Sequence, residues 1–385
     1  MPGDTPFVKW FEDVDASATH VVGGKCASLG ELRKAGVNVP AGFAVTTHAH
    51  LEFLERAGLT ERLAKIVAGV DPQDVAAVAS ASEELRGLVE SVPAPLEIED
   101  AIREAHAALE ERCGGGPLPV AVRSSATAED HYTASFAGQL ETYLWVQGID
   151  DVLRDVVRCW SGLFTPHAIT YRSQFGFADE QVLVSVGIQQ MVDARAAGVL
   201  FTLNPTNGDR SKVMIESCWG LGEGIVKGEV NPDRFLVDKV TLSVLKRTVS
   251  AKEREYRFDP SLGVVAAAPV DDDRRSAPSV SDQEVLELAR TGKDIERHYG
   301  APQDVEWAFG RSAGSSGAGR ESEGLFILQS RAETVWSRRP RASVFKPGAS
   351  ALEHVVDRFV GAPGDSGPEN ASPGGPAPGE PAPQP

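Results

Sequence analysis

The chain has 385 residues, of which 42% are hydrophobic, and this is enough for a large core in two or three lobes. Its formal net charge of -17 produces a field that repels nucleic acid and anionic membranes, which excludes polyanion binding as the main function. The four cysteines lie far apart with no C-x-x-C spacing, so neither a zinc site nor a disulfide framework is indicated.

Helical patterns dominate the first part of the chain. Residues 25–113 contain amphipathic runs such as ASLGELRKAG, closed by Gly36, and APLEIEDAIREAHAALEERC, closed by a run of glycines. We expect a mostly helical N-terminal lobe over residues 1–117.

Strand and loop patterns begin at Leu118. LPVAVRS, ETYLWV, two helical runs and VLVSVGIQQMV predict a central lobe over residues 118–195. AGVLFTL, KVMIES and the helix-like VSDQEVLELARTGKDIERHYG follow in a C-terminal lobe over residues 196–340. Residues 361–385 are rich in proline and glycine and hold too few apolar side chains to offset the entropy of ordering, so we expect a disordered tail there.

Two strand-like segments, QDVEWAF and LFILQSR, carry closely spaced polar side chains. Because side chains alternate between the faces of a strand, Asp304 and Glu306 share one face, and Gln329 and Arg331 share one face of the second strand. Pairing the strands could gather these groups on one polar surface. Carboxylate and amide oxygens suit Mg²⁺, and a guanidinium suits phosphate. A salt-bridged solvent face is the alternative.

The run VVGGKCASLGEL contains a candidate phosphate contact. Gly23 and Gly24 permit close approach of the backbone, and Lys25 stands at the beginning of a helix, where free N–H groups favour anions. The spacing differs from that of a Walker A loop. A turn followed by a solvated lysine fits this short motif equally well.

The run VAVRSSATAEDHYTASFAGQLETYLWV predicts a second phosphate contact. A strand ends at Arg123, and Ser124 and Thr127 follow among small residues. Such a loop offers hydroxyl and backbone donors to a polyphosphate, with Arg123 as the fixed cation. The alternative is a serine-rich loop that caps a helix.

Two further segments are candidates for holding a nucleoside. In IQQMV, Met191 and Val192 could clamp a flat base while backbone groups of the segment, which includes Gln189, read its edge. Glu216 ends the strand KVMIES before a glycine-rich run and could accept hydrogen bonds from a ribose or a base. A core strand and a tight turn are the respective alternatives.

Taken in order, GGKCASLGEL, VRSSATAED, SFAGQLETYL, IQQMV, GVLFTLNP, IESCWGLGEGIVKGEV, DVEW and LQSR resemble the N-terminal nucleotide-binding domain of phosphoenolpyruvate synthase and pyruvate phosphate dikinase. The resemblance covers residues 21–331. It implies an α+β, ATP-grasp-like fold of two to three lobes that holds Mg-ATP between lobes.

The resemblance also implies roles for the residues singled out above. Lys25, Arg123 and Arg331 would act on the phosphates as catalytic cations, and Glu306 and Gln329 would hold Mg²⁺. The implied nucleotide-binding set comprises Lys25, Arg123, Ser124, Thr127, Gln189, Met191, Val192, Glu216, Asp304 and Arg331.

Full-length members of this family continue into a domain whose histidine, in a T-x-G-G-x-x-x-H context, accepts a phosphoryl group. None of the eight histidines in this sequence has that context. We therefore expect a partner subunit with a phosphohistidine domain, an arrangement that resembles phenylphosphate synthase. The chain would be the ATP-binding subunit of a split dikinase, passing the β-phosphoryl group of ATP to the partner's histidine and giving AMP and phosphate.

Two other functions stay open from the sequence. A nucleotide-sensing regulatory module would bind ATP without turnover, although the retained cations and metal ligands argue against it. A stand-alone small-molecule kinase would need an acceptor site, which no motif indicates. The acidic N-terminus does not resemble a signal peptide, and no run of about 18 apolar residues follows, so we expect a cytoplasmic protein.

Overall fold

The computed structural model describes residues 6–127, 141–175, 183–313 and 323–336. All of them belong to one unit, Met1–Ser337. The tail expected at residues 361–385 lies outside the described residues.

A five-stranded antiparallel sheet is built from distant parts of the chain, in the order β1-β2-β5-β3-β4. Two short strands come from the region whose pattern predicts helices: β2 pairs with β5, and β1 joins the sheet by pairing with β2. The strands are β1 (Val8–Trp10), β2 (Gly42–Val45), β3 (Val120–Ala126), β4 (Thr142–Val146) and β5 (Val184–Gln190).

Helices pack against this sheet and bury large apolar side chains such as Phe53, Leu85 and Trp160. The long amphipathic run predicted before the glycines forms α5, and the predicted helical pair forms α6 and α7. The helices are α2 (Thr47–Arg56), α3 (Thr60–Ala68), α4 (Val75–Glu90), α5 (Leu96–Arg112), α6 (Ile149–Ser161) and α7 (Pro166–Phe175), with short 3₁₀ turns at Phe11–Asp13, Ala16–Ala18 and Gly162–Phe164.

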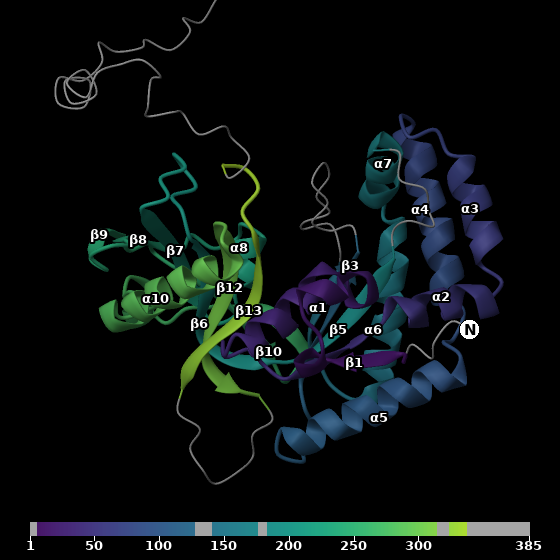
Figure 1. Cartoon of the computed structure of the whole chain (residues 1–385), viewed down its shortest axis with the longest axis horizontal. Coiled ribbons are helices and arrows are strands. Elements are labelled where there is room, and N and C mark those ends of the chain that lie inside the picture. Colours follow the sequence, from purple (N-terminus) through teal and green to yellow (C-terminus); the bar gives the residue numbers. More distant parts are fainter. Residues whose placement is uncertain (1–5, 128–140, 176–182, 314–322, 337–385) are drawn as a thin grey trace, which may run out of the picture. The chain divides into compact units, whose positions relative to one another are not determined.

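A six-stranded antiparallel sheet has the order β13-β12-β6-β7-β8-β9. The helix α10 (Asp282–Tyr299) covers one face of this sheet (Figure 1), and its buried Val285 and Leu288 belong to the same apolar cluster as Trp307 of β12. Its N-terminus has a capping box between Ser281 and Glu284. The strands are β6 (Val192–Phe201), β7 (Lys212–Trp219), β8 (Asp233–Asp238), β9 (Val244–Thr248), β12 (Gln303–Ser312) and β13 (Gly324–Ala332).

Smaller elements complete the described chain. A two-stranded ribbon consists of β10 (Arg254–Asp259) and β11 (Val264–Pro269), and α8 (Glu223–Val226) and α9 (Asp272–Arg275) are single turns. No helix among the described residues combines the length and the apolar character needed to cross a bilayer.

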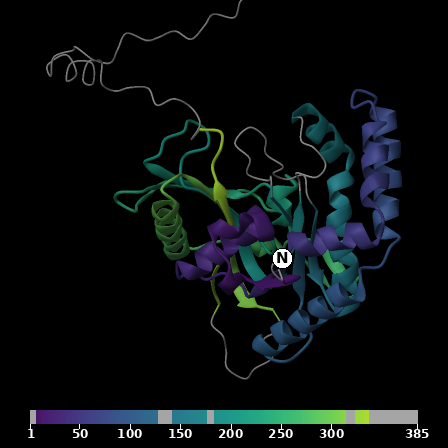
Figure 2. The same ribbon diagram turned by 45° about the vertical axis from the view of Figure 1, so that its right-hand side comes forward.

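The helix α1 (Thr19–Lys34) contacts both large sheets, through β3 and β5 on one side and β13 on the other (Figures 1 and 2). Gly23 interrupts it with φ 70° and ψ 170°, so the helix proper begins just before Lys25. A Cβ at this glycine would lie 2.0 Å from the backbone oxygen of Ser125. The glycine thus lets α1 approach the backbone of β3 closely, while its role at a phosphate stays a prediction.

The observed elements form the α+β architecture expected from the sequence. The three-lobe division at 117/118 and 195/196 stays a prediction. The structure shows that β1 and β2 share a sheet with β3 to β5, and that β6 begins at Val192, directly after Met191.

Candidate functional site

A row of side chains crosses the six-stranded sheet on the face opposite α10. Gln329 lies opposite Glu306, Glu306 opposite Val199, Val199 opposite Glu216, and Glu216 opposite Arg234. Directly paired residues of antiparallel strands share a face. The sheet therefore aligns an amide and two carboxylates from three different strands along one line.

A second row runs beside the first. Arg331 lies opposite Asp304, and Asp304 opposite Phe201. The guanidinium of Arg331 donates through Nε to Oδ2 of Asp304 at 2.8 Å and through Nη2 at 2.5 Å. Burial raises the pKa of Asp304 above its usual value, and Arg331 opposes this shift. The alternation argument is confirmed, because Asp304, Glu306, Gln329 and Arg331 lie on one face.

Arg123 reaches this face from the five-stranded sheet. Its Nη2 donates to Oε1 of Gln329 at 2.8 Å and to Oε2 of Glu306 at 3.1 Å, and its Nη1 donates to the backbone oxygen of Leu328 at 3.1 Å. The oxygens of Glu306 and Gln329 thus converge on a single cationic nitrogen.

Lys25 is held beside Arg123 by β3 itself, which continues to Ala126 and does not end at Arg123 as the sequence predicted. Its Nζ donates to the backbone oxygen of Ser124 at 3.1 Å. Ser125 ties the same two segments together, because its hydroxyl accepts from the N–H of Cys26 at 3.1 Å and donates to the oxygen of Val22 at 2.8 Å. The two motifs with candidate cations are therefore adjacent.

One small pocket brings several of these side chains together. Lys25, Arg123, Gln189 and Gln329 contribute its polar lining. Gln189 is 2% exposed, and its Nε2 has no hydrogen-bond partner among the described residues. A buried amide N–H without a partner is unfavourable, which makes Gln189 a candidate ligand contact.

The hydroxyls of Ser124 and Thr127 form hydrogen bonds within the protein. Ser124 is fully buried and donates to the backbone oxygen of Glu141 at 3.2 Å, and the hydroxyl of Thr127 accepts from the N–H of Leu183 at 3.2 Å.

The strand register places one further residue beside the proposed cations, since the exposed Thr142 lies opposite Arg123. Only the pairing of β3 with β4 reveals it.

The proposed nucleoside contacts lie on both sheets. Met191 separates β5 from β6, with its N–H donating to Pro119 at 3.0 Å and its oxygen accepting from Ala313 at 2.9 Å. Val192 begins β6 and is buried. Glu216 lies in the first row and pairs with Arg234 at 2.7 Å. The roles of these residues stay predictions.

Within the described ranges, no group of three or more His, Cys, Asp or Glu side chains could hold a metal ion. A cation site in this region therefore depends on the amide oxygen of Gln329 together with Glu306. Both are neutral or anionic oxygen donors, which suits a hard cation.

Comparison with known proteins identifies the family of the chain. The family model described as "Pyruvate phosphate dikinase, AMP/ATP-binding domain" matches residues 19–350. A probable phosphoenolpyruvate synthase of Methanocaldococcus jannaschii is 43% identical over 303 residues, which are 79% of this chain and 25% of that protein. The phosphoenolpyruvate synthase of Pyrococcus furiosus is 37% identical over 366 residues, 86% of this chain and 44% of that protein.

A bacterial relative is similar over a comparable part of the chain. The phosphoenolpyruvate synthase of Neisseria meningitidis serogroup B is 40% identical over 346 residues, which are 86% of this chain and 42% of that protein. The chain thus spans less than half the length of these curated relatives. With the family model matched over most of its length, the chain belongs to the pyruvate phosphate dikinase AMP/ATP-binding domain family, whose fold is ATP-grasp-like.

Proposed function

We propose that this chain binds Mg-ATP at the pocket between its two large sheets and passes the β-phosphoryl group to a histidine of a partner subunit. The observation that supports this most is the convergence of Arg123 on Glu306 and Gln329, together with the pocket that Arg123 and Gln329 line with Lys25. Two cations and two oxygen ligands are the groups that a polyphosphate and its metal require.

The residues present fit Mg²⁺. The oxygens of Glu306 and Gln329 already face one positive group, at 3.1 and 2.8 Å from Nη2 of Arg123. In the nucleotide complex these oxygens would hold Mg²⁺, and Arg123 would turn to the phosphates. Bound there, Mg²⁺ would neutralise phosphate charge and orient the phosphate oxygens.

The remaining candidates divide between the two ends of the nucleotide. Gln189, Met191, Val192 and Glu216 would hold the base and the ribose. Gln189 lines the pocket, Met191 and Val192 follow its strand β5, and Glu216 lies in β7. Asp304 would fix Arg331 at the phosphate end through their ion pair. Ser124 and Thr127 would contribute to the nucleotide site at the end of β3, where their hydroxyls form hydrogen bonds within the protein.

The proposed transfer forms one bond and breaks one bond at the β-phosphorus of ATP. A histidine nitrogen bonds to the β-phosphorus while the bond from that phosphorus to the α-phosphate oxygen breaks, and AMP leaves with the electron pair. The γ-phosphoryl group then passes to water or phosphate, leaving the β-phosphoryl group on the histidine. Lys25, Arg123 and Arg331 would stabilise the charge that develops on the phosphate oxygens.

We place the histidine on a partner for two reasons. None of the eight histidines of this sequence has the family's phosphohistidine context. No histidine lines the pocket formed by the described residues.

The test is to incubate the full chain with Mg-ATP labelled at the β-phosphate, with and without the candidate partner. We expect binding by the chain alone, and AMP with label on the partner's histidine only when both are present. A bound nucleotide without a nucleophile gains ground-state stabilisation alone. Rapid AMP or ADP formation by the isolated chain would indicate a self-sufficient kinase, and binding without turnover beside the partner would indicate a sensor.

A further inference from the structure

Glu141 is hydrogen-bonded to Ser124 of β3, the residue after the proposed cation Arg123. Its backbone oxygen accepts two hydrogen bonds from Ser124, from the N–H at 3.3 Å and from the hydroxyl at 3.2 Å. The backbone oxygen of Ser124 in turn accepts from Nζ of Lys25 at 3.1 Å. Two steps therefore connect Glu141 to the Lys25 ammonium group.

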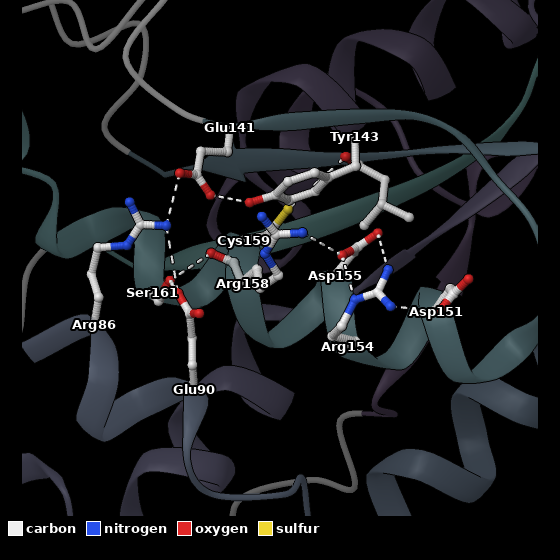
Figure 3. Close-up of polar contacts among 11 residues, drawn as sticks. Arg86, Glu90, Glu141, Tyr143, Asp151, Arg154, Asp155, Arg158, Cys159 and Ser161 are labelled. Atoms are coloured by element: carbon white, nitrogen blue, oxygen red, sulfur yellow. Dashed lines mark hydrogen bonds and ion pairs between the residues drawn. The ribbon is translucent and has the colours of Figure 1, made fainter. Parts of the chain in front are cut away.

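Both carboxylate oxygens of Glu141 are occupied, as Figure 3 shows. Oε1 accepts from Nη2 of Arg86 at 2.9 Å, and Oε2 accepts from the hydroxyl of Tyr143. The guanidinium of Arg158 lies over the Tyr143 ring at 4.3 Å and donates to Asp155 at 3.0 Å. The carboxylate is thus fixed by donors from α4 and β4, which are themselves fixed by neighbouring groups.

These contacts are partly shielded from water. The side chains of Arg86 and Glu141 are 28% and 27% exposed, so their attraction is screened less than that of a surface pair. Burial raises the pKa of Tyr143, and the hydrogen bond to Glu141 adds to the shift, so the phenol remains a donor at neutral and moderately alkaline pH.

From these contacts we infer that Glu141 is a positioning residue of the nucleotide site, acting through Ser124 on Lys25. The inference rests on the proposed function, which assigns Lys25 to the phosphates. None of Arg86, Glu141 and Tyr143 lines the pocket. Their effect on a ligand therefore passes through the backbone of Ser124.

A double-mutant cycle tests this inference. We measure the Kd of Mg-ATP and of adenosine by calorimetry for Glu141→Ala, Lys25→Met and the double variant. The Glu141→Ala variant loses the charge-assisted contacts of the carboxylate. It should bind Mg-ATP about tenfold more weakly than the parent and bind adenosine equally well. In the Lys25→Met background, Glu141→Ala should have no further effect. The shape-conserving Glu141→Gln should recover part of the affinity, because it keeps one acceptor oxygen.

The controls separate positioning from folding. Asp151→Asn breaks the exposed pair with Arg154 in the same region (Figure 3) and should leave Mg-ATP binding unchanged. If Glu141→Ala does not fold, Arg86→Met and Tyr143→Phe remove its donors singly and should each weaken Mg-ATP in the same cycle. The inference would be overturned if the loss of Mg-ATP affinity from Glu141→Ala added to the loss from Lys25→Met. It would also be overturned if Glu141→Ala weakened adenosine binding as much as Mg-ATP binding. Unchanged Mg-ATP binding by Lys25→Met alone would instead overturn the proposed function.

Discussion

Arg123 and Glu306 are 183 residues apart in the sequence, yet Nη2 of Arg123 lies 3.1 Å from Oε2 of Glu306. The two side chains are 15% and 31% exposed and come from different sheets. This ion pair therefore joins the two parts of the proposed site. Binding of a metal nucleotide would compete with it, because Mg²⁺ and the guanidinium of Arg123 would both interact with the oxygens of Glu306.

Replacing Glu306 by Ala should weaken Mg-ATP binding more than tenfold while leaving the melting temperature nearly unchanged. Arg123 keeps its contacts to Gln329 and Leu328, so the loss is that of a metal ligand and not of core packing. Calorimetry with and without Mg²⁺ measures the effect. Glu287→Ala, an exposed residue of α10, is the matched control. Equal Mg-ATP affinity in parent and variant would remove Glu306 from the metal site.

Neutralising Arg123 by Arg123→Met should reduce ATP affinity and spare adenosine. A charge-assisted contact to a phosphate contributes about 1.5–3 kcal/mol, and adenosine has no phosphate to make it. Competition binding with both ligands gives the two affinities. An equal loss for both would show that the substitution disturbs the pocket as a whole.

The buried pair of Lys252 and Asp233 should be a main determinant of stability. Both side chains are 0% exposed, and Asp233 also accepts hydrogen bonds from Ser250 and Ser279. Lys252→Met leaves this carboxylate buried without its cation and should lower the free energy of unfolding by about 3–5 kcal/mol. Urea denaturation measures it. Arg297→Ala, which breaks an exposed pair, should change stability by less than about 1 kcal/mol.

His50 should make stability dependent on pH below neutrality. Burial lowers the pKa of His50 to about 3, whereas in the unfolded chain it titrates at about 6.5. Between these values the unfolded state binds one more proton, so stability falls as pH decreases from about 6.5 towards 3. Between pH 7 and pH 5, His50 should therefore lower the free energy of unfolding by about 2 kcal/mol.

His50→Gln should remove that part of the pH dependence, measured as the difference in urea midpoints at pH 7 and 5. His20→Gln, at an exposed position, should retain it. The assignment to His50 fails if both variants lose stability between these pH values as the parent does.

The sequence alone predicted the features that depend on local pattern. Alternation placed Asp304 and Glu306 on one face, and the strand pair β12–β13 confirms it. The helix after Gly24, its end at Gly36 with φ 80°, and the capped helix α10 also follow from local signals.

Features that depend on pairing between distant segments could not be predicted from the sequence. No local signal places Glu216 in line with Glu306, because the two strands are joined through β6. The short strands β1 and β2 lie among helical patterns and become recognisable only when β2 pairs with β5 and β1 with β2. The network around Glu141 likewise joins Arg86 of α4 to β4.

The row from Gln329 to Glu216 also sets a length scale. Neighbouring strands lie about 4.8 Å apart, so its three strand intervals span about 14 Å. That separation of the strands is fixed by backbone hydrogen bonds. A ligand that contacts both Glu216 and Gln329 must therefore extend across four neighbouring strands, and the sheet itself sets the span that it has to cover.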